Sequence, residues 1–192
     1  MSRVCKIVLV CEGWRDSAFA RGFLGAAGVD ARNLYPKTNP GGSGHDWVKT
    51  QFVEEVAYLQ KFSEGRGVLG LLDEDGHGAI ARSGAVSTLL QAHGLPSINS
   101  NHGLCLLLPT RNLETWLYWL KAQRNGTSVI LEEVTDYKIT SPVGISKISN
   151  DDCRPAGEFL HSLNHHALPQ SCPPTLGNSL PHLRAFLKAI RR

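Results

Sequence analysis

The sequence lacks a strong excess of charge of either sign. Its 192 residues hold 20 Lys and Arg against 17 Asp and Glu, so the formal net charge is only +3. This balance excludes a polycation that binds nucleic acid through bulk charge, and affinity for an acidic partner must come from a local arrangement of residues. Hydrophobic residues make up 42% of the chain and charged residues 19%, which excludes a disordered tail and predicts a buried core.

Long hydrophobic runs and paired cysteine motifs are absent too. The longest apolar run near the start, Ile7–Cys11, is far too short to span a bilayer, and no cleavable signal follows it. The five cysteines are odd in number and scattered, which favours reduced thiols, so we expect a cytoplasmic protein with no membrane partner. No C-x-x-C pair is present, which disfavours a zinc site. The residues considered for zinc are Cys153, His161, His165 and Cys172.

What the sequence does contain is an alternation of apolar runs and amphipathic segments. Runs that are apolar on both faces are typical of central strands in a parallel sheet, and they occur at Lys6–Cys11, Gly67–Leu72 and Leu104–Leu108. A shorter strand is expected around Tyr35. Apolar residues three or four positions apart predict helices at 16–27, 47–62, 81–93 and 113–121. Asn112 is expected to cap the last of these helices.

The last third of the chain has weaker patterns. Pro155 is expected to start a helix that runs through Leu163, and Pro181 a final helix to Arg192. The proline-rich stretch Pro169–Gly177 is expected to be a surface loop. The whole order of elements predicts an α/β fold, a Rossmann-like and mainly parallel sheet sandwiched by helices, with a C-terminal helical elaboration. We assign 1–125 to the core and 126–192 to the elaboration of the same domain.

Carboxylates follow the predicted strands. In an open α/β sheet, ligands bind outside the carboxyl ends of the strands, so these side chains are expected to meet at one rim. If the backbone after the second strand is extended, Asp73 and Asp75 point to the same face. Crowded carboxylates repel one another unless cations lie among them, and hard oxygen ligands favour Mg²⁺ or Mn²⁺, the ions that serve phosphoryl transfer. The five candidates are Glu12, Asp16, Asp73, Asp75 and Glu114.

A structural alternative stays open for each of these residues. A single acidic residue after a strand often caps the next helix, and Asp16 in particular could serve only that purpose. For Asp73 and Asp75 a cap is the weaker interpretation, because glycines rather than an apolar helical start follow them at Gly76 and Gly78.

These motifs resemble a known family. The segment Val-Cys-Glu-Gly-Trp-Arg-Asp at 10–16 and the segment Leu-Leu-Asp-Glu-Asp at 71–75 resemble the toprim domain. The segment Leu-Pro-Thr-Arg-Asn-Leu-Glu at 108–114 is most similar to OLD-type nucleases and small stand-alone toprim proteins. The resemblance covers Lys6 to about Lys121 and implies a toprim-like core at 1–125. Asn112 stands where OLD-type proteins often have serine.

The resemblance implies a role for each acidic residue. Glu12 takes the place of the toprim glutamate, as a metal ligand and catalytic residue, and Asp73 with Asp75 takes the place of the DxD pair. Asp16 and Glu114 would complete a two-metal site for Mg²⁺ or Mn²⁺. OLD-type nucleases also carry a lysine beyond the third core strand, for which Lys147 is the first candidate and Lys138 the second.

Three further residues are candidates for contact with nucleic acid. Lys37 and His45 flank a glycine-rich loop that could reach over the site, and His77 follows the DxD pair. Each of them could equally be an exposed polar residue. The sequence shows no base-reading motif and does not distinguish DNA from RNA.

The resemblance therefore leads to one expectation of function and two alternatives. The expectation is a divalent-metal-dependent nuclease that hydrolyses phosphodiester bonds of DNA or RNA. One alternative is a non-catalytic toprim-fold subunit that docks on an ATPase or nucleoprotein partner, and the other is a metal-dependent phosphohydrolase or nucleotidyl-transfer enzyme that acts on nucleotides. No Gly-x-x-x-x-Gly-Lys-Ser motif is present, so any ATPase would be a separate chain. Stand-alone toprim proteins of this kind suggest defence against mobile elements or nucleic-acid repair.

Overall fold

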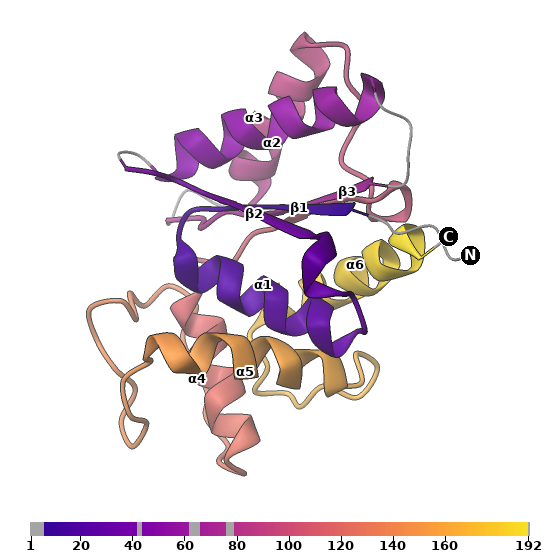
Figure 1. Cartoon of the computed structure of the whole chain (residues 1–192). Coiled ribbons are helices and arrows are strands. Elements are labelled where there is room, and N and C mark those ends of the chain that lie inside the picture. Colours follow the sequence, from indigo (N-terminus) through magenta and orange to yellow (C-terminus); the bar gives the residue numbers. More distant parts are fainter. Residues whose placement is uncertain (1–5, 42–43, 62–65, 76–78, 192) are drawn as a thin grey trace.

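A computed structural model of the chain describes residues 6–41, 44–61, 66–75 and 79–191 (Figure 1). The strands are β1 (Lys6–Cys11), β2 (Leu34–Thr38), β3 (Arg66–Leu71) and β4 (Leu104–Leu107). The helices are α1 (Trp14–Ala26), α2 (Gly44–Lys61), α3 (Ala79–Ala92), α4 (Glu114–Arg124), α5 (Asn150–Ser162) and α6 (Pro174–Ile190). Short 3₁₀ turns lie at Ala31–Asn33 and Ser100–His102. Within the described ranges, no helix has the length and apolar character needed to cross a membrane.

The four strands form one parallel sheet in the order β2-β1-β3-β4, which confirms the predicted α/β fold. The chain moves outward from β1 to β2 and then returns to place β3 on the other side of β1. The order of the strands therefore reverses between β1 and β3. In sheets of this class, that switch point is where the carboxyl ends of two strands leave a crevice for a ligand.

Helices cover both faces of the sheet, which explains why the strands are apolar on both sides. Ile7 and Leu9 face the core that contains α1, α4, α5 and α6. Val8 and Val10 face the second core, which is built on α2 and α3. In Figure 1, α2 and α3 lie above the sheet and the other four helices lie below it.

The C-terminal helices pack on the same side as α1. α6 crosses β3 so closely that a Cβ on Gly67 would lie 2.8 Å from a side-chain carbon of Ile190 and 2.9 Å from Phe186. α5 lies on the far side of α1 from the sheet (Figure 1). Cys153 and Leu160 of α5 are fully buried in the core that they share with β1.

The start of α5 differs from the prediction. The helix begins at Asn150 and Pro155 lies inside it. Ser149 and Asp152 form a capping box in which Ser149 N and Oγ donate to Asp152 Oδ2 at 2.8 and 2.9 Å. This cap starts the helix five residues earlier than the proline predicted, because a cap satisfies the free N–H groups of the first turn.

The start of α6 also differs. The helix begins at Pro174, not at Pro181, so the end of the predicted Pro169–Gly177 loop is helical. A proline in the first turn loses no hydrogen bond, which makes Pro174 a good start. Glu133, from a distant loop, accepts a hydrogen bond from Thr175 N at 2.9 Å and so caps the helix with a side chain that the local sequence does not contain.

Two glycines allow α1 and α5 to cross in backbone contact. A Cβ on Gly22 would lie 2.1 Å from the carbonyl oxygen of Arg154, and a Cβ on Gly157 would lie 2.0 Å from the carbonyl oxygen of Phe19. Neither position can accept a methyl group unless the helices move apart. The crossing therefore fixes how the N-terminal ends of α1 and α5 lie relative to each other.

We expect Gly157→Ala to lower the free energy of unfolding by at least about 2 kcal/mol, because the new methyl group overpacks the helix crossing. Gly25→Ala is the matched control, since a Cβ there meets nothing within 4 Å. In a helix this exchange should raise stability by about 0.5–1 kcal/mol. Urea denaturation of the three proteins measures both effects. Equal stability of Gly157→Ala and wild type would contradict the close crossing.

Candidate active site at the carboxyl ends of the strands

Glu12 and Asp73 meet at the switch point of the sheet. Glu12 directly follows β1, and Asp73 lies two residues beyond the end of β3. Asp73 N donates a hydrogen bond to Glu12 Oε1 at 3.1 Å. Because β1 and β3 are neighbours in the sheet, their parallel pairing brings the two carboxylates together, as the sequence predicts.

A pocket of about 320 Å³ opens at this point. Its lining combines acidic residues with two cations: Glu12, Gly13, Trp14, Arg15, Asp16, Asp73, Glu114, Lys138 and Asn150. The helices α1, α4 and α5 all begin at its rim, at Trp14, Glu114 and Asn150. Helix N-termini carry partial positive charge, so they favour the carboxylates gathered here.

Asp73 connects three separate parts of the chain. Its Oδ1 atom accepts a hydrogen bond from Leu113 N at 3.0 Å, and its Oδ2 atom lies 2.6 Å from Lys138 Nζ. The carboxylate is therefore tied to the end of β3, to the start of α4 and to the irregular segment 126–149. Asp73 is 4% exposed, whereas the side chain of Lys138 is 46% exposed, so the ion pair joins a buried carboxylate to an ammonium group that water still reaches.

Asp16 and Glu114 complete the acidic wall. Asp16 is the third residue of α1, and its Oδ2 atom accepts a hydrogen bond from Gly13 N at 2.7 Å. The helix starts two residues earlier than predicted, and Asp16 does cap it, as the structural alternative proposed. Its carboxylate nevertheless also lines the pocket. Glu114, at the start of α4, is 6% exposed.

Arg15 is a site residue that the sequence interpretation missed. Its Nη1 atom lies 3.0 Å from Glu114 Oε1, and its Nε atom donates to Asn150 Oδ1 at 3.1 Å. One guanidinium thus joins the beginnings of α1, α4 and α5. The local sequence held a signal, because Arg15 lies between Glu12 and Asp16 in the segment that carries the toprim resemblance.

Burial and mutual repulsion raise the pKa of three carboxyl groups, those of Glu12, Asp16 and Asp73. The pKa of Glu12 is raised to about 7, first by burial and then by the charge of Asp73. The pKa of Asp73 is raised to about 6 by burial, against the opposing effect of Lys138. The pKa of Asp16 is also well above its usual range, again through burial and Asp73. Burial disfavours the charge of Lys138, but Asp73 outweighs it and raises the lysine pKa.

The backbone turns at Asp75, contrary to the expectation of an extended DxD pair. Asp75 has φ +51°, in the left-handed region, and so does Arg111 with φ +61°. Asp75 N donates to Arg111 O at 3.2 Å, so the turn is fastened to the segment after β4. The Asp75 carboxylate is outside the pocket lining, 3.9 Å from Arg82 of α3. Its charge still contributes to the raised pKa of Glu12.

Of the two candidate lysines, the structure brings Lys138 and not Lys147 to the acidic residues. Lys147 is exposed and absent from the pocket lining. Its backbone oxygen accepts a hydrogen bond from Lys121 Nζ at 3.3 Å, and Lys121 also pairs with Asp152 at 3.0 Å. These contacts hold this stretch between α4 and α5. Lys138, the second candidate, therefore lies at the pocket, and Lys147, the first candidate, does not.

Asn112 and Asp136 hold Lys138 in position. Asn112 is not the N-cap of α4, since Leu113 occupies that place. Instead Asn112 Nδ2 donates to Asp136 Oδ1 at 2.9 Å, and the same oxygen accepts from Lys138 N at 3.0 Å. Arg111 lies 3.4 Å from the other oxygen of Asp136. Asp136 thus fastens the irregular segment to the start of α4, a role that no local pattern indicated.

The candidates for nucleic-acid contact do not gather in the pocket. Lys37 lies on β2 but forms an ion pair with Glu55 of α2, on the opposite face of the sheet from α1. His45 lies at the start of α2, 3.3 Å from Asp46. His77 lies outside the described residues. The start of α2 does approach the site, because a Cβ on Gly44 would lie 2.7 Å from Glu12 Oε2.

The donor chemistry of the pocket fits a hard divalent cation, since its wall offers carboxylate oxygens from Glu12, Asp16 and Asp73. As the side chains now lie, however, no group of three or more His, Cys, Asp or Glu residues within the described ranges has a metal-binding geometry. Lys138 and Arg15 are paired with the carboxylates instead. A metal ion would therefore have to compete with these two cations.

Comparison of the chain with protein-family models, with curated proteins and with solved structures finds no match. Function must therefore be argued from the residues of the site and their geometry.

The raised pKa of Glu12 predicts how stability depends on pH without divalent metal. Between its ordinary pKa of 4.5 and its folded pKa of about 7, the folded protein binds more protons than the unfolded chain. The free energy of unfolding therefore falls as pH rises through this window. Glu12→Gln should make the fall shallower, and at about pH 8 it should be more stable than wild type by about 1 kcal/mol or more.

Urea denaturation across the pH range, in the presence of a chelator, measures this effect. Glu54→Gln removes an exposed carboxylate of α2 and serves as the control. If Glu12→Gln and Glu54→Gln follow the same pH profile, the Glu12 carboxyl does not carry the proposed proton.

Proposed function

We propose that this protein is a divalent-metal-dependent nuclease that hydrolyses phosphodiester bonds of DNA or RNA. The observation that carries the proposal is the pair of carboxylates, half-buried Glu12 and buried Asp73, at the switch point of a parallel sheet with Lys138 beside them. The resemblance of the segments 10–16 and 71–75 to the toprim domain supports the same chemistry.

Each group has a task in this reaction. Glu12, Asp16 and Asp73 would hold Mg²⁺ or Mn²⁺, with Glu114 as a further oxygen donor, and the ion supplies positive charge for the phosphate oxygens. Alternatively, Asp16 and Asp73 would hold the ion, and Glu12, whose pKa without metal is raised to about 7, would act as the general base that accepts a proton from the attacking water. Lys138 provides a cation for the charge that develops on the phosphate.

The two cations would stabilise the acidic residues before a metal ion binds. Lys138 neutralises Asp73, and Arg15 neutralises Glu114. Lys138 belongs to a segment without helix or strand, and its side chain is 46% exposed. It can therefore move from Asp73 toward a phosphate when a metal ion takes over the neutralisation of the carboxylate.

Glu12→Gln tests the acidic centre. The exchange keeps the size of the side chain and the acceptor for Asp73 N, but removes the basic oxygen, so cleavage should fall at least about a hundredfold. The measurement is cleavage of plasmid, single-stranded DNA and RNA with millimolar Mn²⁺, with nucleotides as further substrates. Millimolar Mn²⁺ should also raise the melting temperature of the wild-type protein, because a bound ion stabilises the folded state.

Glu54→Gln should cleave like wild type. Full activity of Glu12→Gln would contradict the proposed centre. Hydrolysis of nucleotides without polymer cleavage would favour a nucleotide phosphohydrolase, and absence of both activities and of metal stabilisation would favour a non-catalytic subunit that needs a partner.

A second pair of variants tests the lysine. Lys138→Met removes the ammonium group beside Asp73, and we expect cleavage to fall at least about tenfold, because one charged group near the transition state is lost. Lys147→Met removes an exposed lysine that does not line the pocket and should cleave like wild type. Cleavage rates under single-turnover conditions compare the two variants, and the reverse order would restore Lys147 as the catalytic lysine.

A further inference from the structure

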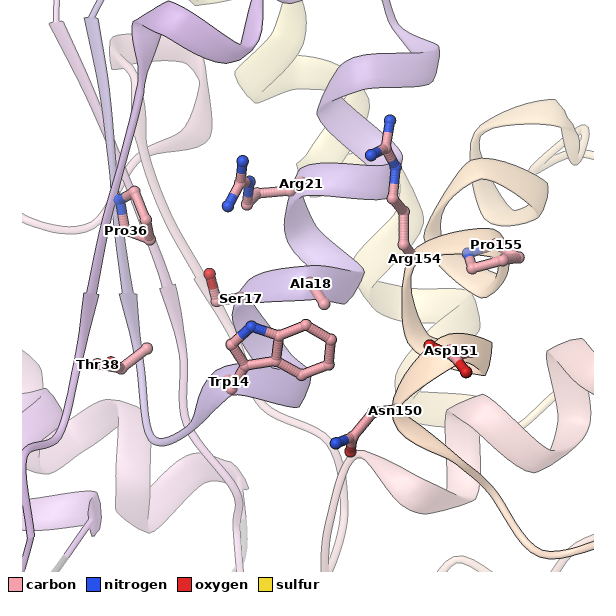
Figure 2. Close-up of a pocket in the computed structure, with 10 residues that line it drawn as sticks. All are labelled: Trp14, Ser17, Ala18, Arg21, Pro36, Thr38, Asn150, Asp151, Arg154 and Pro155. Atoms are coloured by element: carbon pink, nitrogen blue, oxygen red, sulfur yellow. The ribbon is translucent and has the colours of Figure 1, made fainter.

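A second hollow lies directly beside the acidic pocket and shares Trp14 and Asn150 with it. It has a volume of about 490 Å³ and lies between α1, the first half of α5 and the edge strand β2 (Figure 2). Pro36 and Thr38 form the β2 side, and Arg154 belongs to the α5 side. A hollow of this size is typical of sites for small molecules or single residues of a polymer.

The hollow continues into a third one of about 450 Å³, with which it shares Arg21 and Arg154. On α1 the lining residues Trp14, Arg21 and Gly25 are seven and four positions apart, so they lie along one face of the helix. The second and third hollows form a groove, hereafter the α1 groove, which begins beside the acidic pocket and follows this face of α1. Along α1, Trp14 and Arg21 are separated by about 10 Å of helix.

Trp14 gives the α1 groove an aromatic surface. Its side chain is 58% exposed, in contrast to the fully buried Trp116 and Trp119. Figure 2 shows the indole between the β2 wall and the α5 wall of the hollow. An exposed tryptophan does not contribute the hydrophobic stabilisation that a buried one gives the folded chain. A flat aromatic surface at a groove is a common platform on which an unstacked base lies.

Arg21 gives the same groove a free cation. It is exposed and has no hydrogen-bond or ion-pair partner within the described parts of the chain. Arg154, across the groove on α5, is paired with Glu158 at 3.0 Å, and Asp151 adds a negative charge nearer to the acidic pocket. The positive charge open to a ligand is therefore that of Arg21, about two helical turns from Trp14.

We infer that the α1 groove binds a single-stranded polynucleotide, with a base stacked on Trp14 and a backbone phosphate at Arg21. This inference rests on the proposed function and names the form of its substrate. The carboxylates of the acidic pocket repel phosphate until a cation is bound. Affinity for the strand must therefore come from residues beside the pocket. A duplex is excluded, because its bases are stacked on each other and offer no free face to Trp14.

Fluorescence anisotropy with labelled 12-nucleotide oligonucleotides tests the inference. Oligo-dT and oligo-U are measured in EDTA, where no cleavage occurs, beside a 12-base-pair duplex and unlabelled thymidine monophosphate as competitor. Trp14→Ala should weaken binding of the single strands about tenfold or more, and Trp14→Phe by about threefold or less, because base stacking needs only the aromatic face. Tyr58→Ala, an exposed aromatic residue on α2, should bind like wild type.

Two further readouts separate stacking from charge. Binding should quench the tryptophan emission of wild type, and Trp14→Phe should lose most of this quenching, because Trp116 and Trp119 are buried and Trp47 lies on α2, outside the α1 groove. Arg21→Ala should reduce the slope of log K against log salt by about 0.7, the loss of one phosphate contact on a single strand. Arg124→Ala, at the exposed end of α4, should leave the slope unchanged.

Equal affinity of Trp14→Ala and Tyr58→Ala would overturn the inference, as would tighter binding of the duplex than of the single strands. If thymidine monophosphate competes as strongly as the unlabelled oligonucleotide, the inference of a polymeric ligand is wrong and the α1 groove is a site for nucleotides. Because binding is measured without metal, it fails separately from the proposed function. If the wild-type protein cleaves and Trp14→Ala binds the strand as tightly as wild type, only the inference about the α1 groove is wrong. If binding depends on Trp14 but the wild-type protein does not cleave, only the proposed nuclease function is wrong.

Discussion

The repulsion between carboxylates at the ends of β1 and β3 is the constraint to which the surrounding structure responds. Glu12 and Asp73 are joined through the Asp73 amide, and the pKa of each is raised because Glu12 is half-buried and Asp73 is buried. Such a cluster would destabilise the fold unless positive charge were brought to it. Lys138, Arg15 in the first turn of α1 and the beginnings of α1, α4 and α5 supply that charge.

The close crossing of α1 and α5 helps to bring positive charge to the carboxylates. Gly22 and Gly157 let the two backbones touch, so Arg15 on α1 can reach Asn150 at the start of α5. The same crossing forms one side of the α1 groove. An acidic centre and a neighbouring groove with an exposed aromatic side chain are thus parts of one arrangement, in which chemistry and substrate affinity can be supplied by different residues.

The parts of the structure that depend on local patterns could be predicted from the sequence. Lys6–Cys11 is apolar on both faces because helices cover both sides of the sheet. Glu12 directly follows this strand and therefore lies at the switch point. The sequence named Lys138 only as the second candidate lysine, through the resemblance. Its pairing with Asp73 could not be derived, because the two residues are 65 positions apart and Lys138 lies in a segment without periodicity. The start of α6 escaped prediction for a related reason, since Glu133 caps it from a distant loop.

Pro36, described above as a wall of the α1 groove, also has a consequence for how copies of the protein behave toward one another. It lies in the middle of β2, an outer strand whose second edge no other strand covers within the described sheet. A proline has no N–H to donate, so this edge is one donor short and is a poor template for strand addition by another chain. The residue that shapes the groove thereby protects the sheet from aggregation at its open side.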